Sequence, residues 1–427
     1  MRRRTPPLIP GKVESAWLTT ALAATDGASA TAATVREQRA TALISDGDAL
    51  SLAGDLVQLL RFPGSLPELP PDALPRLMHE TAATVLAAPA GEGRAARPVT
   101  IGGFGSLLLA AACLPLLPEA PAAVGGIVAT QALSAVLGLG VRPMLVLAGT
   151  ASDLPEGMRE QIVAGARAPC AASSLALASG RRLQAGSPAC VVLAVGYVPP
   201  ARFGWRGALP GDCLIVAKAL GTDLLLAAWR AGRLSPQEQA LLLATATQPL
   251  TPGPLLACLE RVHAQAVAGQ RGLLGALLEL CSDASLSVGA LINITALPVL
   301  PAAHPLLAAD GVDGAARRNL ERDGARLAVD AAWSCAAKDA AGDGDGDGDG
   351  DGAVAAARLF LAGAAPGGNL LVCCAAEAAT EVLAALLEYD FGNAAVIGQI
   401  VAGERQVTLA GTRAAAIAAA DSSLRRG

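Results

Sequence analysis

Residues 210–222 read PGDCLIVAKALGT, and this stretch carries the strongest structural signal in the chain. Cys213 to Lys218 is a short, mostly apolar run that follows a Pro-Gly-Asp turn, which predicts a buried strand. Lys218 ends this strand next to Gly221 and Thr222, and a helix is predicted to follow over 223–231. Backbone and hydroxyl donors at this junction could meet a phosphate. A plain strand-to-helix turn, with Thr222 or Asp223 as the helix cap, explains the same residues equally well.

The segment before this strand indicates a domain boundary. Residues 199–211 contain three Pro, three Gly and one Trp, and such frequent Pro and Gly are typical of a connection. A chain of 427 residues is also long for one compact core. We therefore expect an N-terminal domain over 1–205 and a C-terminal domain over 206–427. Strands and helices alternate in both halves, which predicts two α/β layers of similar size.

The N-terminal half gives signals of unequal strength. In chain order we predict a helix over 12–44, a turn at 45–48, a hairpin over 49–60, a Pro-rich loop over 63–75, a weak Ala/Leu/Pro stretch over 76–121, a helix over 122–138, a strand over 143–149, a helix from about 154 and a strand over 189–198. The weak part, about 65–120, is a candidate insertion.

The C-terminal half continues with helices over 223–231 and from Pro236, where Ser235 is the predicted N-cap. Residues 342–352 repeat Gly-Asp five times, and such low complexity cannot build a core. We therefore expect a flexible surface linker over 339–353. Beyond it, residues 359–409 alternate strand, helix and strand.

Composition excludes several classes of function. The formal net charge is −5 and no basic stripe with interleaved aromatics occurs, so nucleic-acid binding is not expected. The nine Cys form no CxxC pair and only three His are present, which argues against a zinc site or a disulfide scaffold and favours reduced thiols inside the cell. The apolar stretch from 122 to about 141 contains Gln131 and Ser134, and we interpret it as a buried helix and not a membrane span. The expected location is cytoplasmic.

Several stretches, in order, resemble motifs of the selenophosphate synthetase (selenide, water dikinase) family. Residues 210–222 resemble its "PGD, apolar strand, KPLGT" signature, with Ala219 in place of Pro. Residues 272–279, GLLGALLE, resemble its "GLLGHLLE" helix, and 318–321 match its "RNLE" segment. Residues 367–371, followed further on by AVIG, resemble the end of its "TSGGLL … AVIG" region.

The N-terminal half resembles the family more loosely. Residues 10–12 lie where the family carries "GCK", and 46–49 resemble its "GDDAA" turn. Residues 131–135, QALSA, resemble its "NALSD" helix. The resemblance covers nearly the whole chain apart from 65–120 and the Gly-Asp tract. It implies an α/β (α+β), two-domain PurM-like (AIR synthase-like) architecture, with helices packed on one side of each sheet.

The resemblance also implies a chemistry. Family members use ATP, selenide and water to make selenophosphate, AMP and phosphate, with Mg²⁺ held by carboxylates against the phosphates. Carried over position by position, Lys12 becomes the catalytic phosphate contact, and Asp46 and Asp48 become metal ligands. Asp48, together with Arg61, Lys218 and Thr222, becomes a nucleotide-binding residue. Without the family context, Lys12 is a solvated lysine and the two aspartates are turn residues that cap the backbone.

Several residues of the family motifs, mostly acidic ones, are replaced in this chain. Gly11 replaces the family's Cys, and Arg61 stands where an Asp is expected. In the "NALSD" helix, Gln131 replaces the Asn and Ala135 replaces the Asp. Val267 stands near the Asp of the "TDVTGFG" segment. Loss of one well-placed stabiliser costs about 10²–10³ in rate, so we expect the family reaction to be impaired.

Three functions therefore compete. The first is an active synthetase with unusual ligands. The second is a degenerate paralogue that acts as a binding or regulatory subunit. The third is another phosphoryl-transfer enzyme on the PurM-like fold. The family dimerises by joining sheets into a shared barrel, so a homodimer or a heterodimer with an intact family member is expected. The expected small-molecule partners are a nucleotide and, if the chain is active, selenide, and no membrane partner is expected.

Overall fold

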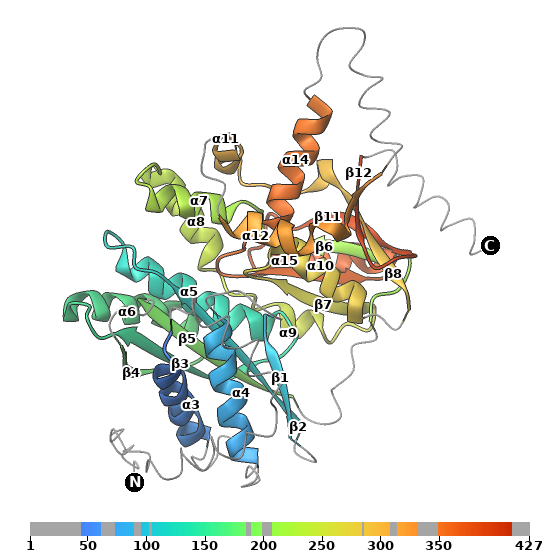
Figure 1. Cartoon of the computed structure of the whole chain (residues 1–427). Coiled ribbons are helices and arrows are strands. Elements are labelled where there is room, and N and C mark those ends of the chain that lie inside the picture. Colours follow the sequence, from blue (N-terminus) through green and yellow to red (C-terminus); the bar gives the residue numbers. More distant parts are fainter. Residues whose placement is uncertain are drawn as a thin grey trace.

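A computed structural model describes residues 44–60, 73–88, 95–101, 105–184, 189–198, 207–283, 286–307, 314–330 and 349–411. It has two β-sheets with helices around them (Figure 1). The mixed α/β class with two layered halves is therefore confirmed. The predicted helix over 12–44 lies outside the described residues almost entirely, and Lys12 and Arg61 lie outside them as well. No helix in the described part is both long and apolar enough to cross a membrane.

The N-terminal half contains a five-stranded sheet with the strand order β1-β2-β5-β3-β4. Its elements are α3 (Asp46–Leu60), α4 (Ala73–Ala87), β1 (Arg97–Ile101), β2 (Gly105–Leu114), α5 (Pro121–Leu137), β3 (Pro143–Ala151), α6 (Glu156–Ala172), β4 (Leu177–Leu183) and β5 (Cys190–Val198). The strands pair antiparallel except β3 with β4. The predicted helix over 122–138 and the predicted strands over 143–149 and 189–198 are confirmed as α5, β3 and β5.

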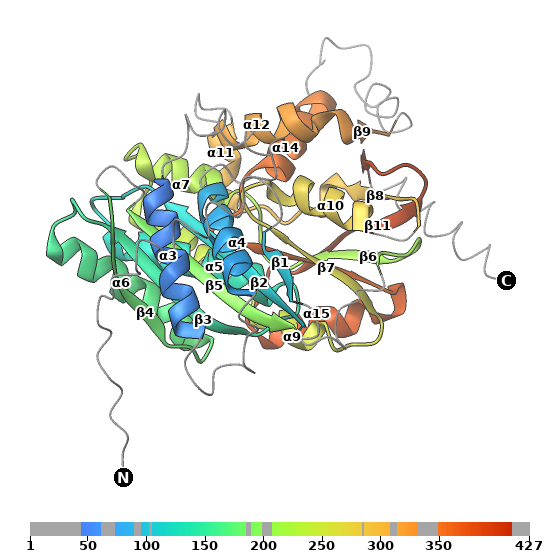
Figure 2. The same cartoon turned by 60° about the horizontal axis from the view of Figure 1, so that its bottom comes forward.

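Helices cover both faces of this sheet, whereas one-sided packing was expected. Successive strand residues point to opposite faces. In β5, Val191, Leu193 and Val195 pack with α3 and α4 in one apolar cluster, and the residues between them pack with α5 in another. Figure 2 shows α3 and α4 in front of the sheet. Glycines let α5 and α6 approach closely, because a Cβ on Gly125 would collide with the backbone of Ile162.

The hairpin predicted over 49–60 is wrong, since these residues form α3. Ser45 begins the helix: its hydroxyl accepts a hydrogen bond from the Asp48 amide (3.1 Å) and donates one to the Asp48 carboxylate (2.8 Å). The cap thus satisfies the Asp48 amide, which has no partner inside the helix. Leu52, Leu56 and Leu60 then recur at helical spacing and are all buried.

The candidate insertion is part of the sheet wherever it is described. Residues 73–114 supply α4, β1 and β2, and β2 pairs with β5 from Ser106 to Leu114. The strand therefore lies inside the sheet and not at its periphery. The predicted linker over 339–353 also needs correction at its end, because α14 begins at Asp349, within the Gly-Asp tract.

The C-terminal half contains a seven-stranded sheet in the order β7-β10-β6-β11-β8-β12-β9. Its elements are β6 (Cys213–Val216), α7 (Thr222–Arg230), α8 (Pro236–Ala246), α9 (Gly253–Leu256), β7 (Val262–Ala268), α10 (Gly272–Asp283), β8 (Val288–Asn293), α11 (His304–Leu307), α12 (Gly314–Asp323), β9 (Leu327–Val329), α14 (Asp349–Ala362), β10 (Asn369–Cys374), α15 (Ala379–Glu388), β11 (Ala395–Ala402) and β12 (Val407–Ala410). Short 3-10 turns lie at Ile294–Ala296, Pro301–Ala303, Gly324–Arg326 and Ala376–Ala378. Figure 2 shows α10, α12 and α14 on one side of the sheet and α15 on the other.

The predicted start of α8 is confirmed. Ser235 and Glu238 form a capping box, with Pro236 at the first helical position. The strand predicted from Cys213 is confirmed as β6, and the helix after it as α7.

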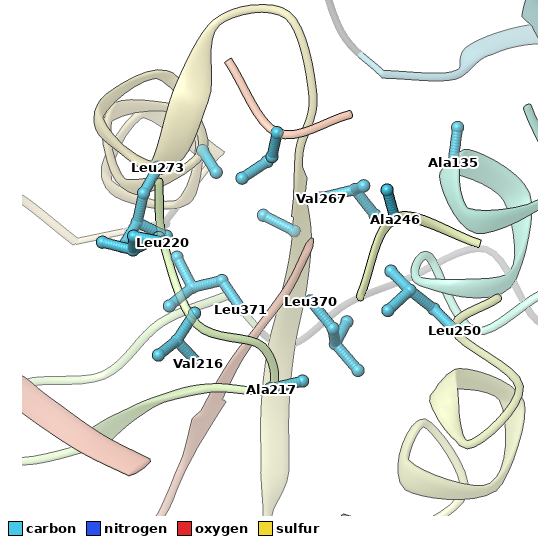
Figure 3. Packing of buried hydrophobic residues seen from close by; sticks show 14 of the residues in the cluster. Ala135, Val216, Ala217, Leu220, Ala246, Leu250, Val267, Leu273, Leu370 and Leu371 are labelled. Atoms are coloured by element: carbon cyan, nitrogen blue, oxygen red, sulfur yellow. The ribbon is translucent and has the colours of Figure 1, made fainter. Parts of the chain in front are cut away.

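One apolar core joins the two halves. The cluster that contains α5 also contains residues of β6, β7, β10 and α10. Figure 3 shows side chains from both halves in this core: Ala135 comes from α5, and Val267, Leu370 and Leu371 come from strands of the second sheet. A hydrogen bond from the Leu250 amide to the Ser134 hydroxyl (3.3 Å) crosses the same junction. The two sheets are therefore packed as neighbours through continuous side-chain contact.

Candidate active site

A cavity of about 460 Å³ lies where the two halves meet. Its walls come from α4, the start of β1, β2 and α5 on one side, and from the end of β7, α10 and Gly368 on the other. A pocket of this size falls in the range of small-molecule sites, which often lie between domains. Two other cavities, of about 430 and 10 Å³, are described below.

The cavity brings together three positions singled out from the sequence. Gln131 and Ala135 are four residues apart on α5 and so share one face of that helix. Val267 belongs to β7, in the other half, and lines the same cavity. The family resemblance expects polar or acidic side chains at all three positions, and here only Gln131 is polar.

The loop from Gly269 to Arg271 forms one wall of the cavity and joins β7 to α10. The buried side chain of Asn319 holds it in place, because its amide nitrogen donates to the carbonyl of Gln270 (2.8 Å) and to that of Ala362 (2.7 Å). Asn319 lies in the RNLE stretch, which therefore supports the cavity from behind.

Two arginines line the cavity from opposite halves. Arg271 donates through its terminal nitrogen to Asp323 (2.9 Å), while its Nε is buried and has no hydrogen-bond partner. Arg97 pairs with Glu80 (2.9 Å), and its side chain is 52% exposed. Arg322 also donates to Asp323 (3.1 Å). Burial raises the pKa of Asp323, but the hydrogen bonds from Arg271 and Arg322 outweigh it and hold that pKa below its usual value.

A second polar atom in the cavity wall lacks a partner. The side-chain oxygen of Gln131 is buried without a hydrogen bond. Leaving such an atom unpaired costs about 1–3 kcal/mol, so its presence next to a cavity is a sign of a ligand site. An amide can present either its oxygen or its NH₂ group to that ligand.

The residues of the cavity do not fit a bound Mg²⁺. Mg²⁺ needs hard oxygen ligands in octahedral array, usually including one or two carboxylates. The described lining contains one carboxylate, Glu279, and two guanidinium groups. In the described residues no group of three or more His, Cys, Asp or Glu side chains is placed to hold a metal.

Asp46 and Asp48, the predicted metal ligands, lie away from this cavity. Both are in the first turn of α3, next to the end of β4. The carboxylate of Asp48 accepts hydrogen bonds from the amide of Gln184 (3.0 and 3.1 Å) and from the Ser45 hydroxyl. Strand β4 forms one edge of the sheet, whereas β1 and β2 border the cavity at the other edge. Asp48 thus connects α3 to β4.

Lys218 and Thr222 meet at a second, much smaller cavity. Its volume of about 10 Å³ is that of one water molecule, and it shares Gly368 with the large cavity. Lys218 is 4% exposed; its ammonium donates to the carbonyl of Gln248 (2.6 Å), and its backbone pairs with the Asn369 side chain (2.7 and 2.8 Å). Burial lowers the pKa of Lys218 to about 7. The predicted nucleotide contact through Lys218 and Thr222 stays a prediction.

The sequence did not predict the three charged residues of the large cavity, Arg97, Arg271 and Glu279. Arg271 directly precedes the GLLGALLE stretch and Glu279 is its last residue, so this motif is a signal that could have identified both. Arg97 lies in the segment that we set aside as an insertion. For Lys12 and Arg61, which lie outside the described residues, the predicted roles stay predictions.

A third cavity, of about 430 Å³, lies at the far end of the C-terminal sheet. There the buried carboxylate of Asp212 accepts from Nδ1 of His263 (2.9 Å to each oxygen), from the Leu209 amide (2.8 Å) and from the thiol of Cys373 (3.2 Å). These bonds join the turn before β6 to the neighbouring strands β7 and β10. They are sufficient to explain the Asp of the PGD turn as a structural residue.

Comparison with known proteins agrees with this description. Residues 210–410 match the family model "AIR synthase related protein, C-terminal domain". Among curated proteins, selenide, water dikinase of Dechloromonas aromatica is 34% identical over 290 residues, which is 66% of this chain and 76% of that protein. Selenide, water dikinase of Paraburkholderia xenovorans is 33% identical over 298 residues, which is 69% of this chain and 78% of that protein. The crystal structure of thiamine-monophosphate kinase from Stenotrophomonas maltophilia has a TM-score of 0.51 at 20% identity and covers 75% of this chain and 93% of its own.

Proposed function

This chain belongs to the selenide, water dikinase family, and we propose that it is a nucleotide-binding member in which the family's phosphoryl-transfer reaction is impaired. The nucleotide occupies the large cavity between the two sheets. ATP is the nucleotide that the family reaction uses, and AMP is its product.

The lining of that cavity is the observation that carries this proposal. Gln131 and Ala135 on α5 and Val267 on β7 converge on it, although 132 residues separate Ala135 from Val267 in sequence. A cavity of small-molecule size with a single carboxylate, Glu279, in its described lining supports binding without efficient turnover. Phosphoryl transfer depends on charge neutralisation at the reacting phosphate, and an alanine or a valine supplies none.

The partner of this chain in solution is part of the same proposal. Helices α3 and α4 cover one face of the N-terminal sheet and α5 and α6 lie on the other. A homodimer or heterodimer would therefore use an edge strand, β1 or β4, or an outer helical surface, unless α3 and α4 move away. Light scattering of the pure chain at several concentrations, alone and mixed with an intact family member, tests this part.

Two measurements on one sample test the proposed function. Calorimetry with ATP and with AMP should give binding in the micromolar to millimolar range. Release of AMP from ATP should then be assayed with selenide, beside the Dechloromonas aromatica relative as the active reference. We expect a rate at least about 10²-fold below that reference. A rate within tenfold of the reference would refute the impairment, and an absence of binding at near-millimolar nucleotide would refute the nucleotide site.

A further inference from the structure

We propose that the large cavity holds the phosphate of its nucleotide directly through Arg271, without a divalent cation. The inference rests on the proposed function, since it specifies how the same cavity recognises its ligand. Four features of the described residues support it.

The first feature is the balance of charge in the cavity wall. The described lining contains the guanidinium groups of Arg97 and Arg271 and one carboxylate, that of Glu279, while the ion-pair partners of the two arginines, Glu80 and Asp323, do not line it. A divalent cation in the cavity would therefore find one hard anionic ligand in the wall, with two guanidinium groups beside it. A phosphate group in the same place meets the opposite situation, because guanidinium groups bind phosphate oxygens with short, charge-assisted hydrogen bonds.

The second feature is the unused donor of Arg271. Its Nε is buried and has no hydrogen-bond partner, while a terminal nitrogen is bonded to Asp323 (2.9 Å). Asp323 therefore anchors the guanidinium group, and the N–H groups that this bond does not use include the unpartnered Nε–H. Because Arg322 also donates to Asp323 (3.1 Å), two cations share one carboxylate, and Arg271 is not fully neutralised by its partner.

The third feature is the helix that begins beside this side chain. Arg271 directly precedes α10 (Gly272–Asp283), which has twelve residues. The helix dipole places a partial positive charge at this end of α10, although the Gly272 amide already donates to the carbonyl of Gly269 (3.1 Å) and the residues of α10 that line the cavity are Gly275, Ala276 and Glu279. The positive φ of Gly272 (66°) lets the chain turn sharply from the cavity loop into this helix, and a Cβ at that position would collide with the carbonyl of Gly363.

The fourth feature lies on the opposite wall. Gln131 has a buried side-chain oxygen with no partner, and its amide can turn its NH₂ group towards an anion. Ala135 and Val267 line the same cavity and have no side-chain atom that could bind a cation. Arg271 and Gln131 therefore offer polar contacts from both halves of the chain.

Calorimetric titration of the full chain with ATP and with AMP tests this inference, each in EDTA and each in excess MgCl₂. We expect the dissociation constant to differ less than about threefold between the two conditions. An affinity that requires Mg²⁺, by tenfold or more, would overturn the inference and leave the nucleotide site itself standing. An absence of nucleotide binding in both conditions would instead refute the proposed function on which it rests.

Substitutions identify the residue that carries the effect. Arg271→Gln should weaken AMP binding in EDTA by about 10–100-fold, the value of a hydrogen bond to a charged group. Arg261→Gln, which removes an exposed arginine at the third cavity, is the matched control and should bind as the unchanged chain does. If Arg271→Gln fails to fold, Arg97→Gln removes the other guanidinium group of the cavity wall, which is half-exposed. This variant should weaken AMP binding by at least about threefold. Equal affinity in the arginine variants of the large cavity and in the control would overturn the assignment.

Discussion

The pH dependence of the free energy of unfolding gives a quantitative test of the burial of Lys218. Its side chain is 4% exposed, and burial lowers its pKa from 10.5 to about 7 in the folded chain. Between these two values the unfolded chain carries a proton on Lys218 that the folded chain does not. The unfolded state therefore binds more protons, and stability rises with pH across this window. The stabilisation is fully present above pH 10.5 and is lost as the pH falls to about 7.

The size of the effect follows from the shift. Each pH unit inside the window changes the free energy of unfolding by about 1.4 kcal/mol. From pH 7 to pH 9 the gain is about 2 kcal/mol, because the folded lysine is still half protonated at pH 7. Lys218→Met has a similar length and no charge, so it should lack this gain. Below the window both states carry the proton, and the contribution of Lys218 no longer varies with pH.

Urea denaturation of both proteins at pH 7, 8 and 9 measures the difference. Other groups that titrate in this range, including the buried thiols, affect both proteins alike, so their contribution cancels when the two are compared. The free energy of unfolding of the unchanged chain relative to Lys218→Met should increase by about 2 kcal/mol from pH 7 to pH 9. Parallel pH dependence of the two proteins would show that Lys218 keeps its ordinary pKa and is open to water, as a phosphate-binding lysine would be.

Two further predictions concern the polar cluster and the thiols. Asp212→Asn should lower the free energy of unfolding by about 3 kcal/mol, because the buried carboxylate accepts from both His263 and Cys373; a loss below about 1 kcal/mol by urea denaturation would contradict the structural role of the cluster. In maleimide labelling of the folded chain at pH 7, the exposed Cys258 should react first among the eight cysteines of the described residues, and Cys258→Ser should remove the labelling of its peptide. Cys190, whose pKa burial raises to about 12, should react only after denaturation, and early labelling of Cys190 in a peptide map would contradict its burial.

Apolar runs with clear boundaries were predictable from the sequence. The elements α5, β3, β5 and β6 are long or strongly apolar and are bounded by Pro or Gly, so a single pattern fits each. The start of α8 was also predictable, because Ser235 and Pro236 are direct helix-start signals. In these segments local sequence and tertiary packing favour the same structure.

Short segments with an ambiguous apolar pattern were predicted poorly for a physical reason. The stretch from Ala49 to Leu60 contains five Leu and two Ala interrupted by small and polar residues, and this pattern fits both a period of two and a helical period. The decisive signal was the pair Ser45 and Asp48, spaced as a helix cap immediately before the apolar run. The same ambiguity concealed α4 and β2 in the segment described as an insertion.

The candidate site was predictable only in part. Gln131, Ala135 and Val267 lie in stretches that resemble family motifs, and the structure brings them together. Arg97 could not be found in this way, because its relation to Arg271 depends on how two distant sheets pack. The predicted role of Asp48 rested on a short turn motif, and the structure places that turn at the other edge of the sheet.

The shared core of the two sheets has a consequence for ligand recognition. Since the cavity walls come from both halves, a sliding motion between the halves would change the width of the cavity and separate Arg271 from Gln131. Close-packed side chains resist such sliding, and Ser134 and Leu250 are hydrogen-bonded across the junction. The shape of the cavity is thus set before the ligand arrives, and little entropy is lost in ordering it. Substitutions in this core, far from any ligand contact, should therefore alter affinity as well as stability.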